Sequence, residues 1–309
     1  MFYRKLTRNE LKIELSKPAK EVRINDLKIT DNGRLKILID DVIFESFFSN
    51  SDQKRLFVCL TDAATSLYPT FQRASWQSTL EGMFLCFDDP TKNRPIPPPI
   101  PLTYYFGENN NNYADLLIQI VRKIASLHSI PVQDIVFIGS SMAGFAALYC
   151  CDKLIGSKCL TFNPQFFIKD WLESRTFFND KDYEKLFSIS FNDGINKNRI
   201  DLSDIYKNKE SRFFIFINTE SEPDKHQIDK FCFLNKFKYK RGIQKINNIL
   251  LYISPFKAPH PHQVFPIEQT CKVFLNSLYR FSIDSCDEDV YSAFISINAW
   301  YNRNLMSKT

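Results

Sequence analysis

Glycine, histidine and long apolar runs are scarce in this chain, and each scarcity narrows what the protein can be. Only 8 of the 309 residues are glycine, against 29 phenylalanines, which predicts an aromatic core joined by short turns. Nowhere do about eighteen apolar residues stand together, so no membrane-spanning helix is expected. The N-terminal residues carry no apolar segment of the signal-peptide kind, and we therefore expect a cytoplasmic protein.

Sequence patterns for metal binding and nucleic-acid binding are lacking as well. The chain has 8 cysteines but no C-x-x-C pair, and the adjacent Cys150 and Cys151 have a spacing unsuited to zinc. Cys59, Cys86 and Cys159 lie in apolar runs, where a thiol behaves as a small hydrophobic group. The formal charge of +5 comes from lysines scattered among acidic residues. We therefore expect a reduced protein with no bound metal and no nucleic-acid partner.

The most informative stretch runs from Ile135 to Leu148, where an apolar strand passes through a turn of small residues into an apolar helix. This arrangement is typical of a nucleophile elbow, in which a serine sits at the tip of a tight strand-to-helix turn. Ser141 occupies that tip, and Gly139 and Gly144 allow the strand and the helix to approach each other. We predict that Ser141 is a nucleophile, with an ordinary strand-to-helix turn as the alternative.

A serine hydroxyl becomes a good nucleophile only beside a base, so the histidines are the next residues to consider. In proteins with an elbow, the acid and then the histidine follow the serine, each after a late strand. His260 and His262 follow the expected strand 249–253, and His262 is the favoured base because it adjoins the apolar Val264. His260 is the alternative base or a substrate contact. His226 is expected to be a surface residue at the start of a helix, or a substrate contact.

The acid that orients the histidine is expected after the preceding strand, 213–217. Asp224 is the favoured residue there. Glu220 and Glu222 are substitutes, because the sequence does not fix a loop conformation to within two residues.

Acyl transfer to a serine also needs hydrogen-bond donors for the tetrahedral oxyanion. The backbone N–H of Met142, directly after Ser141, is one expected donor. The other is expected from the loop after the first core strand, Thr61 to Ala64, at either Asp62 or Ala63.

Buried-type strands alternate with helices from residue 55 onward, which predicts an α/β fold with a mainly parallel sheet. The expected strands are 56–60, 83–87, 135–139, 158–162, 213–217 and 249–253, and the expected helices include 113–127, 267–281 and 290–297. The first fifty residues alternate as hairpin strands, which predicts a small antiparallel β layer ahead of the main sheet. We therefore expect residues 1–50 and 51–309 to form two parts.

Seven short motifs carry a resemblance beyond the elbow. They are Phe71–Trp76, Asp88–Thr91, Tyr104–Gly107, Gly139–Gly144, Phe162–Gln165, Asp224–His226 and His262–Val264. As an ordered set they resemble a group of bacterial α/β-hydrolase-like proteins associated with the biosynthesis of capsules and other surface glycans. The resemblance covers roughly residues 55 to 281. Ala143 departs from the pattern, because such proteins usually carry glycine there.

The resemblance implies an α/β-hydrolase-like fold and serine acyl-enzyme chemistry that adds or removes O-acyl groups, such as acetyl, on a surface glycan. It implies a carbohydrate partner, peripheral association with the glycan machinery, and acetyl-CoA as a candidate acyl donor without a resident cofactor. Arg73 and Trp76 are candidate contacts for an acidic sugar or a coenzyme phosphate, or else a structural ion pair and a core aromatic. In such a fold the insertion 165–209 corresponds to a cap over the site.

A second hypothesis belongs to a different class. The chain could keep the fold as a non-catalytic sugar- or protein-binding component of the polysaccharide machinery. Convergence of Ser141, Asp224 and His262 in space would favour the enzyme, and separation of the three would favour the binding component. A peptidase is a third hypothesis, and no sequence feature points to peptide substrates.

Overall fold

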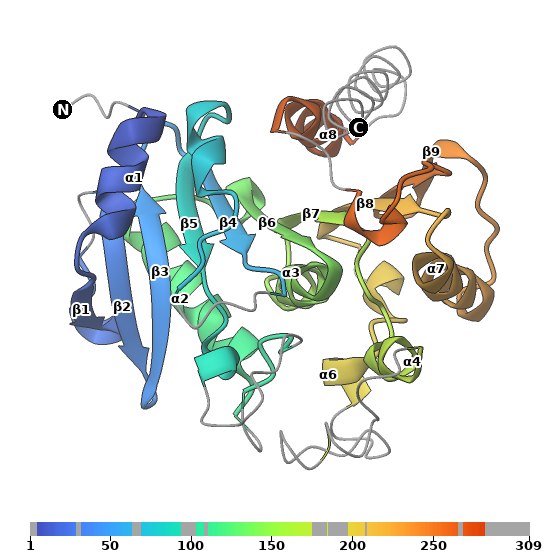
Figure 1. The fold of residues 1–309 in the computed structure, drawn as a ribbon, viewed down its shortest axis with the longest axis horizontal. Helices are drawn as coiled ribbons and strands as arrows, with labels where there is room; N and C mark the ends of the chain where they lie inside the picture. Colours follow the sequence, from blue (N-terminus) through green and yellow to red (C-terminus); the bar gives the residue numbers. More distant parts are fainter. Residues whose placement is uncertain are drawn as a thin grey trace.

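A ten-stranded sheet organises the chain in its computed structural model (Figure 1). The structure describes residues 5–28, 32–63, 69–93, 103–107, 111–174, 184, 197–207, 209–264 and 268–281. The strands are β1 (Lys20–Arg23), β2 (Gly33–Ile39), β3 (Val42–Ser49), β4 (Leu56–Leu60), β5 (Met83–Phe87), β6 (Ile135–Ser140), β7 (Lys158–Phe162), β8 (Arg212–Asn218), β9 (Gly242–Ile246) and β10 (Ile249–Ser254). The α-helices are α1 (Arg8–Ser16), α2 (Tyr113–Leu127), α3 (Ser141–Lys153), α4 (Ile168–Glu173), α6 (Lys197–Ile200), α7 (Glu222–Leu234) and α8 (Glu268–Arg280).

The centre of the sheet is parallel and its margins are mixed. The strand order is β1-β2-β3-β5-β4-β6-β7-β8-β10-β9. The strands from β5 through β4, β6, β7 and β8 to β10 pair in parallel, whereas β3 and β9 pair antiparallel to β5 and β10. Strands buried on both faces read as continuous apolar runs, as the sequence has them. The α/β class expected from the sequence is confirmed.

Alternate side chains of each central strand enter two separate cores. Leu56, Val58 and Leu60 of β4 join the core that contains α2, α3 and α7, whereas Phe57 and Cys59 join the core that contains α8. Figure 1 shows α8 above the sheet and α3 and α7 below it. Helices therefore cover both faces, and the loops at the carboxyl ends of the strands are left to form a site.

The N-terminal strands extend the main sheet, which differs from the separate β layer expected over residues 1–50. The β2–β3 hairpin turns at Asp40 and Asp41, both in the left-handed region with φ of 45° and 62°. Strand β3 then pairs with β5 from Ser46 to Ser49, so hydrogen bonding is continuous across the expected boundary. Burial explains the difference, because Phe44, Phe47 and Phe48 of β3 are fully covered by the rest of the molecule.

Several expected segments fall partly or wholly outside the described residues. The proposed cap, 165–209, is described only at 165–174, 184, 197–207 and 209, where it contains α4 and α6. The expected helix 290–297 lies outside the described residues. None of the helices that the described residues form combines the length and the apolar character needed to cross a membrane.

Candidate active site

The turn between β6 and α3 is strained in the way an elbow requires. Ser141 has φ of 51°, in the left-handed region that non-glycine residues rarely adopt. A Cβ on Gly139 would lie 2.1 Å from the carbonyl oxygen of Ala143, and one on Gly144 would lie 2.8 Å from Cβ of Pro164. Both glycines are therefore required by close packing, whereas Ala143 is accommodated with its side chain fully buried.

Three side chains from distant parts of the chain form one hydrogen-bonded row. The Nε2 atom of His262 lies 2.8 Å from Oγ of Ser141. The Nδ1 atom of His262 lies 2.9 Å from both carboxylate oxygens of Asp224. Because an ionised carboxylate only accepts, Nδ1 carries the proton and Nε2 is free to accept the proton of the serine hydroxyl. The row therefore has the geometry of a nucleophile, a base and an orienting acid.

Burial distinguishes Asp224 and His262 from the alternative acids and the alternative base that the sequence left open. The side chain of Asp224 is 0% exposed and that of His262 is 20% exposed. Glu220, Glu222 and His260 are all exposed. Asp224 stands in the first turn of α7 rather than on the expected loop, and the helix N-terminus there favours its negative charge.

Two buried asparagines hold the histidine loop. Asn163 lies in the resembling motif Phe162–Gln165, which assigned it no role, and no sequence pattern singled out Asn218. The Nδ2 atom of Asn163 donates to the carbonyl oxygen of His262 over 2.8 Å. The Nδ2 atom of Asn218 donates to the carbonyl oxygens of Phe256 and Pro261 over 2.9 and 3.0 Å. The N–H of Asn218 donates in turn to Oδ1 of Asn163 over 2.7 Å, which links the two amides. The backbone of the loop is thus fixed to the ends of β7 and β8.

Trp171 and Gln165 also contact the row. Gln165 ends the resembling motif Phe162–Gln165, but no role at the site was predicted for either residue. The Trp171 ring, on α4, lies 4.7 Å from the His262 ring between centroids, and the Trp171 residue is 2% exposed. The Nε2 atom of Gln165 donates to Oγ of Ser141 over 2.8 Å. Both residues lie in a stretch whose periodicity is too weak to place side chains from sequence.

The residues expected to supply oxyanion donors differ in their availability. Met142 stands in the first turn of α3, where backbone N–H groups have no partner within the helix. The N–H of Asp62 donates to Oε1 of Gln72 over 3.1 Å, and the N–H of Ala63 donates to Oδ1 of Asp62 over 2.8 Å. Both loop amides are therefore already engaged in this structure, and Ala64 lies outside the described residues.

Arg73 contacts the residue that precedes the nucleophile. It donates to Oγ of Ser140 over 2.5 Å and to the carbonyl oxygen of Leu60 over 3.1 Å. The Ser140 hydroxyl donates onward to Asp62 over 2.7 Å. Burial raises the pKa of Asp62, and the hydrogen bond from Ser140 and the charge of Arg73 partly offset that rise. Arg73 thus belongs to an internal polar network.

Trp76 and His226, two further expected substrate contacts, have partners outside the row. Trp76 packs under Arg73, whose guanidinium carbon lies 5.6 Å from the ring centroid. His226 is 63% exposed, and its Nε2 atom lies 3.3 Å from a carboxylate oxygen of Asp170.

Two of the resembling motifs support the loop beside the site. The carboxylate of Asp89 accepts hydrogen bonds from the Thr103 hydroxyl over 2.5 Å and from the N–H of Tyr105 over 2.6 Å. The Tyr105 hydroxyl accepts from the N–H of Thr61 over 3.0 Å and donates to Phe87. These motifs therefore fix the start of the loop that contains Asp62.

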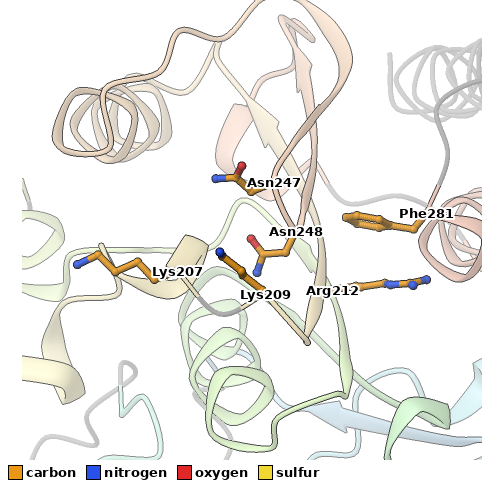
Figure 2. A pocket seen from close by; sticks show the side chains of 6 residues that line it. All are labelled: Lys207, Lys209, Arg212, Asn247, Asn248 and Phe281. Atoms are coloured by element: carbon orange, nitrogen blue, oxygen red, sulfur yellow. The ribbon is translucent and has the colours of Figure 1, made fainter.

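A basic pocket of about 480 Å³ lies at the amino ends of the strands, away from the row (Figure 2). Its lining residues are Lys207, Lys209, Arg212, Asn247, Asn248 and Phe281. Arg212 begins β8 and Asn248 directly precedes β10, so this pocket is at the amino ends of strands whose carboxyl ends carry the row. Figure 2 shows the charged ends of Lys207 and Arg212 extending to opposite sides. The charged ends of these two side chains therefore point away from each other.

No known family model and no curated protein matches the chain. Solved structures do match its fold. A capsule O-acetyltransferase of Neisseria meningitidis serogroup A is 13% identical with a TM-score of 0.53, over 79% of this chain and 96% of that one. A mutant of that O-acetyltransferase in complex with CoA is 14% identical with a TM-score of 0.52, over 77% and 94%.

An esterase of Pyrococcus furiosus is also similar, with 14% identity and a TM-score of 0.53, over 80% of this chain and 91% of that one. Identities this low establish a shared fold and nothing finer. The α/β-hydrolase-like fold expected from the sequence is thereby confirmed.

Proposed function

We propose that this chain uses its α/β-hydrolase-like fold for serine acyl-enzyme chemistry, transferring or removing O-acyl groups on a bacterial surface glycan. The observation that carries the proposal is the hydrogen-bonded row of Asp224, His262 and Ser141 at the strained tip of the elbow. A positive φ at a buried serine costs about 1–3 kcal/mol and is characteristic of functional sites.

The row performs the chemistry in two halves. His262 takes the proton of Ser141 while Oγ attacks the acyl carbonyl carbon, and Asp224 stabilises the imidazolium that forms. Collapse of the tetrahedral intermediate breaks the bond to the leaving group, which receives the proton from His262 and leaves an acyl-serine. A hydroxyl of the acceptor, or water, then gives its proton to His262 and attacks the acyl carbon. Collapse of this second intermediate breaks the bond from the acyl carbon to Oγ of Ser141, and Oγ takes back the proton from His262, which restores the free enzyme.

The nature of the acyl donor and acceptor is supported by the neighbours. A protein of the same fold is a capsule O-acetyltransferase, and one of its structures contains CoA. We propose acetyl-CoA as donor and a carbohydrate hydroxyl as acceptor, in the cytoplasm beside the glycan assembly machinery. With water as acceptor, the same acyl-serine gives an esterase, and the two reactions share every step up to that intermediate.

The first test is covalent labelling of the intact protein with a fluorophosphonate, followed by mass spectrometry. Such a reagent phosphonylates an activated serine with loss of fluoride, so we expect a single adduct on the wild-type chain. Ser141→Ala should abolish the adduct. His262→Ala and Asp224→Asn should slow labelling by about 10³-fold, because the base or its orientation is lost.

Matched controls come from the alternatives at the same loops. His260→Ala and Glu222→Gln change exposed neighbours of His262 and Asp224, and both should label at the wild-type rate. A folded wild-type protein that takes up no label would contradict the proposal. If labelling succeeds, release of CoA from acetyl-CoA with and without a capsular oligosaccharide distinguishes transfer from hydrolysis.

A further inference from the structure

Gln165 reaches the nucleophile from a segment that belongs neither to the elbow nor to the histidine loop. It follows β7 by three positions, and its side chain is completely buried. The Nε2 atom of Gln165 lies 2.8 Å from Oγ of Ser141, which is also 2.8 Å from Nε2 of His262. A second polar group therefore touches the reacting oxygen.

The hydrogen bonding of the row decides which end of the Gln165 amide faces the serine. Nδ1 of His262 donates to Asp224, so Nε2 of His262 accepts the hydroxyl proton of Ser141. The Oγ atom of Ser141 can then only accept further hydrogen bonds. Only the NH₂ end of a carboxamide satisfies an acceptor. That nitrogen carries a second N–H beyond the one directed to Oγ.

The other end of the Gln165 side chain has no hydrogen-bond partner in the part of the chain that the structure describes. Its Oε1 atom is buried and accepts no hydrogen bond from the described residues. An unsatisfied buried acceptor costs about 1–3 kcal/mol. An apolar side chain of the same length would avoid that cost, so packing alone does not account for glutamine here.

The oxyanion that forms during attack needs a second donor beside the N–H of Met142. The two loop amides expected to supply it, at Asp62 and Ala63, are engaged by Gln72 and by the Asp62 carboxylate. The oxyanion develops on the carbon that Oγ attacks, one bond beyond Oγ itself. A donor already 2.8 Å from Oγ reaches that oxygen by a small side-chain rotation.

We infer that Gln165 is a catalytic residue whose side-chain NH₂ group supplies the second oxyanion donor, in place of a backbone amide of the 61–64 loop. The inference rests on the proposed serine acyl chemistry. During attack the Oγ–C bond forms, the carbonyl double bond opens onto its oxygen, and the Gln165 N–H follows the charge from Oγ to that oxygen. No further reactant is required.

The test compares fluorophosphonate labelling rates, because the phosphoryl oxygen of the reagent occupies the position of the oxyanion. Gln165→Met keeps the length of the side chain, removes the donor and removes the unsatisfied acceptor. We expect labelling about 10²-fold slower than wild type, with a melting temperature equal to or above that of wild type. A slower reaction in an equally stable protein is not the signature of a packing residue.

Gln165→Glu supplies a second, independent readout. A carboxylate offers no donor, but its protonated form does, so labelling of this variant should recover relative to wild type as the pH falls. Gln165→Met should show no such recovery. Labelling of Gln165→Met within about threefold of wild type, or a Gln165→Glu to wild-type ratio independent of pH, would overturn the inference while leaving the proposed function intact. An unlabelled wild-type protein would overturn both.

Discussion

Asn163, Pro164 and Gln165 are three consecutive residues that contact three different parts of the candidate site. Asn163, with φ of 45°, binds the backbone of the histidine loop. Pro164 packs on the elbow helix where Gly144 leaves room for it. Gln165 donates to the nucleophile. One short segment therefore fixes the distances between the His262 loop, helix α3 and Ser141. A shift of any one of its three residues would also move the other two and change their contacts.

Asp88 gives a prediction for the pH dependence of stability. Burial raises the pKa of its carboxyl from 3.8 to about 6, although Lys92 Nζ lies 2.6 Å away and partly offsets the rise. Between these two values the folded chain holds a proton that the unfolded chain has released. Stability contributed by this group is thus complete below about pH 4 and is lost as the pH rises through about 6.

The measurement is the free energy of unfolding in urea for wild type and Asp88→Asn, at several values between about pH 4.5 and about pH 7.5. The wild-type value minus the variant value should fall by about 2 kcal/mol over that range, since one pKa unit corresponds to about 1.4 kcal/mol and the scan begins above the unfolded-state pKa. Other carboxyls titrate in both proteins and cancel in the difference. A difference that stays constant or grows with pH would show that Asp88 is not the group responsible.

The residue scale also shows what sequence reasoning can reach. Ser141, Asp224 and His262 were recognisable because their order along the chain and their place after strands are local features. The roles of Asn163, Asn218, Gln165 and Trp171 were not recognisable, although the motif Phe162–Gln165 contains two of them. Each acts through partners between 24 and 99 positions away or through a ring contact across 91 positions. Buried amides make hydrogen bonds that only the folded chain defines, and no periodicity marks them.

At the scale of elements, the elbow packs most tightly where α3 meets the segment after β7. A Cβ at Gly144 would stand 2.8 Å from Cβ and 2.9 Å from Cα of Pro164, and neither neighbour can rotate away. Gly144→Ala should therefore lower the free energy of unfolding by about 1–3 kcal/mol through overpacking, despite the better helix propensity of alanine. It should also slow fluorophosphonate labelling by displacing Gln165.

Ala143→Gly is the matched control on the same turn. It restores the glycine of the general pattern and removes one buried methyl group, which costs about 1 kcal/mol in a helix. Its labelling rate should stay within about threefold of wild type. If both variants lost the same stability and the same reactivity, close contact with Pro164 would not be the cause.

The elements predicted from sequence are those with strong and continuous apolar patterns. The central strands and the helices 113–127 and 268–280 appear within a residue or two of their expected bounds. Strand β9 was not expected, and helix α7 was expected only as a helix start near His226, without bounds. Helix α7 begins inside a charged stretch, and β9 (Gly242–Ile246) is only half-buried, so neither presents the pattern that marks a core element. Helix α1 buries only Leu11 and depends on the capping box at Thr7 and Glu10.

At the scale of the whole molecule, the candidate site has no local origin. Ser141 and His262 are 121 positions apart and meet only because β6, β7, β8 and β10 are neighbours in one sheet. The site should therefore disappear with the sheet and not before it. In increasing urea, the loss of fluorophosphonate reactivity and the loss of far-ultraviolet circular dichroism should follow one curve. Reactivity lost at a clearly lower urea concentration would show that the loops separate before the sheet unfolds.

The sheet ends in two strands that differ from those at its centre. The outer strand β1 is only four residues long and carries the charges of Lys20, Glu21 and Arg23, and the outer strand β9 carries Lys245. An open strand edge is a template on which another chain can add a strand, and charged side chains along a short edge oppose that addition. A sheet of ten strands with a phenylalanine-rich interior would otherwise be a hazard for fibril growth. The polar outer strands thus give this chain a built-in resistance to aggregation at the concentrations a cell maintains.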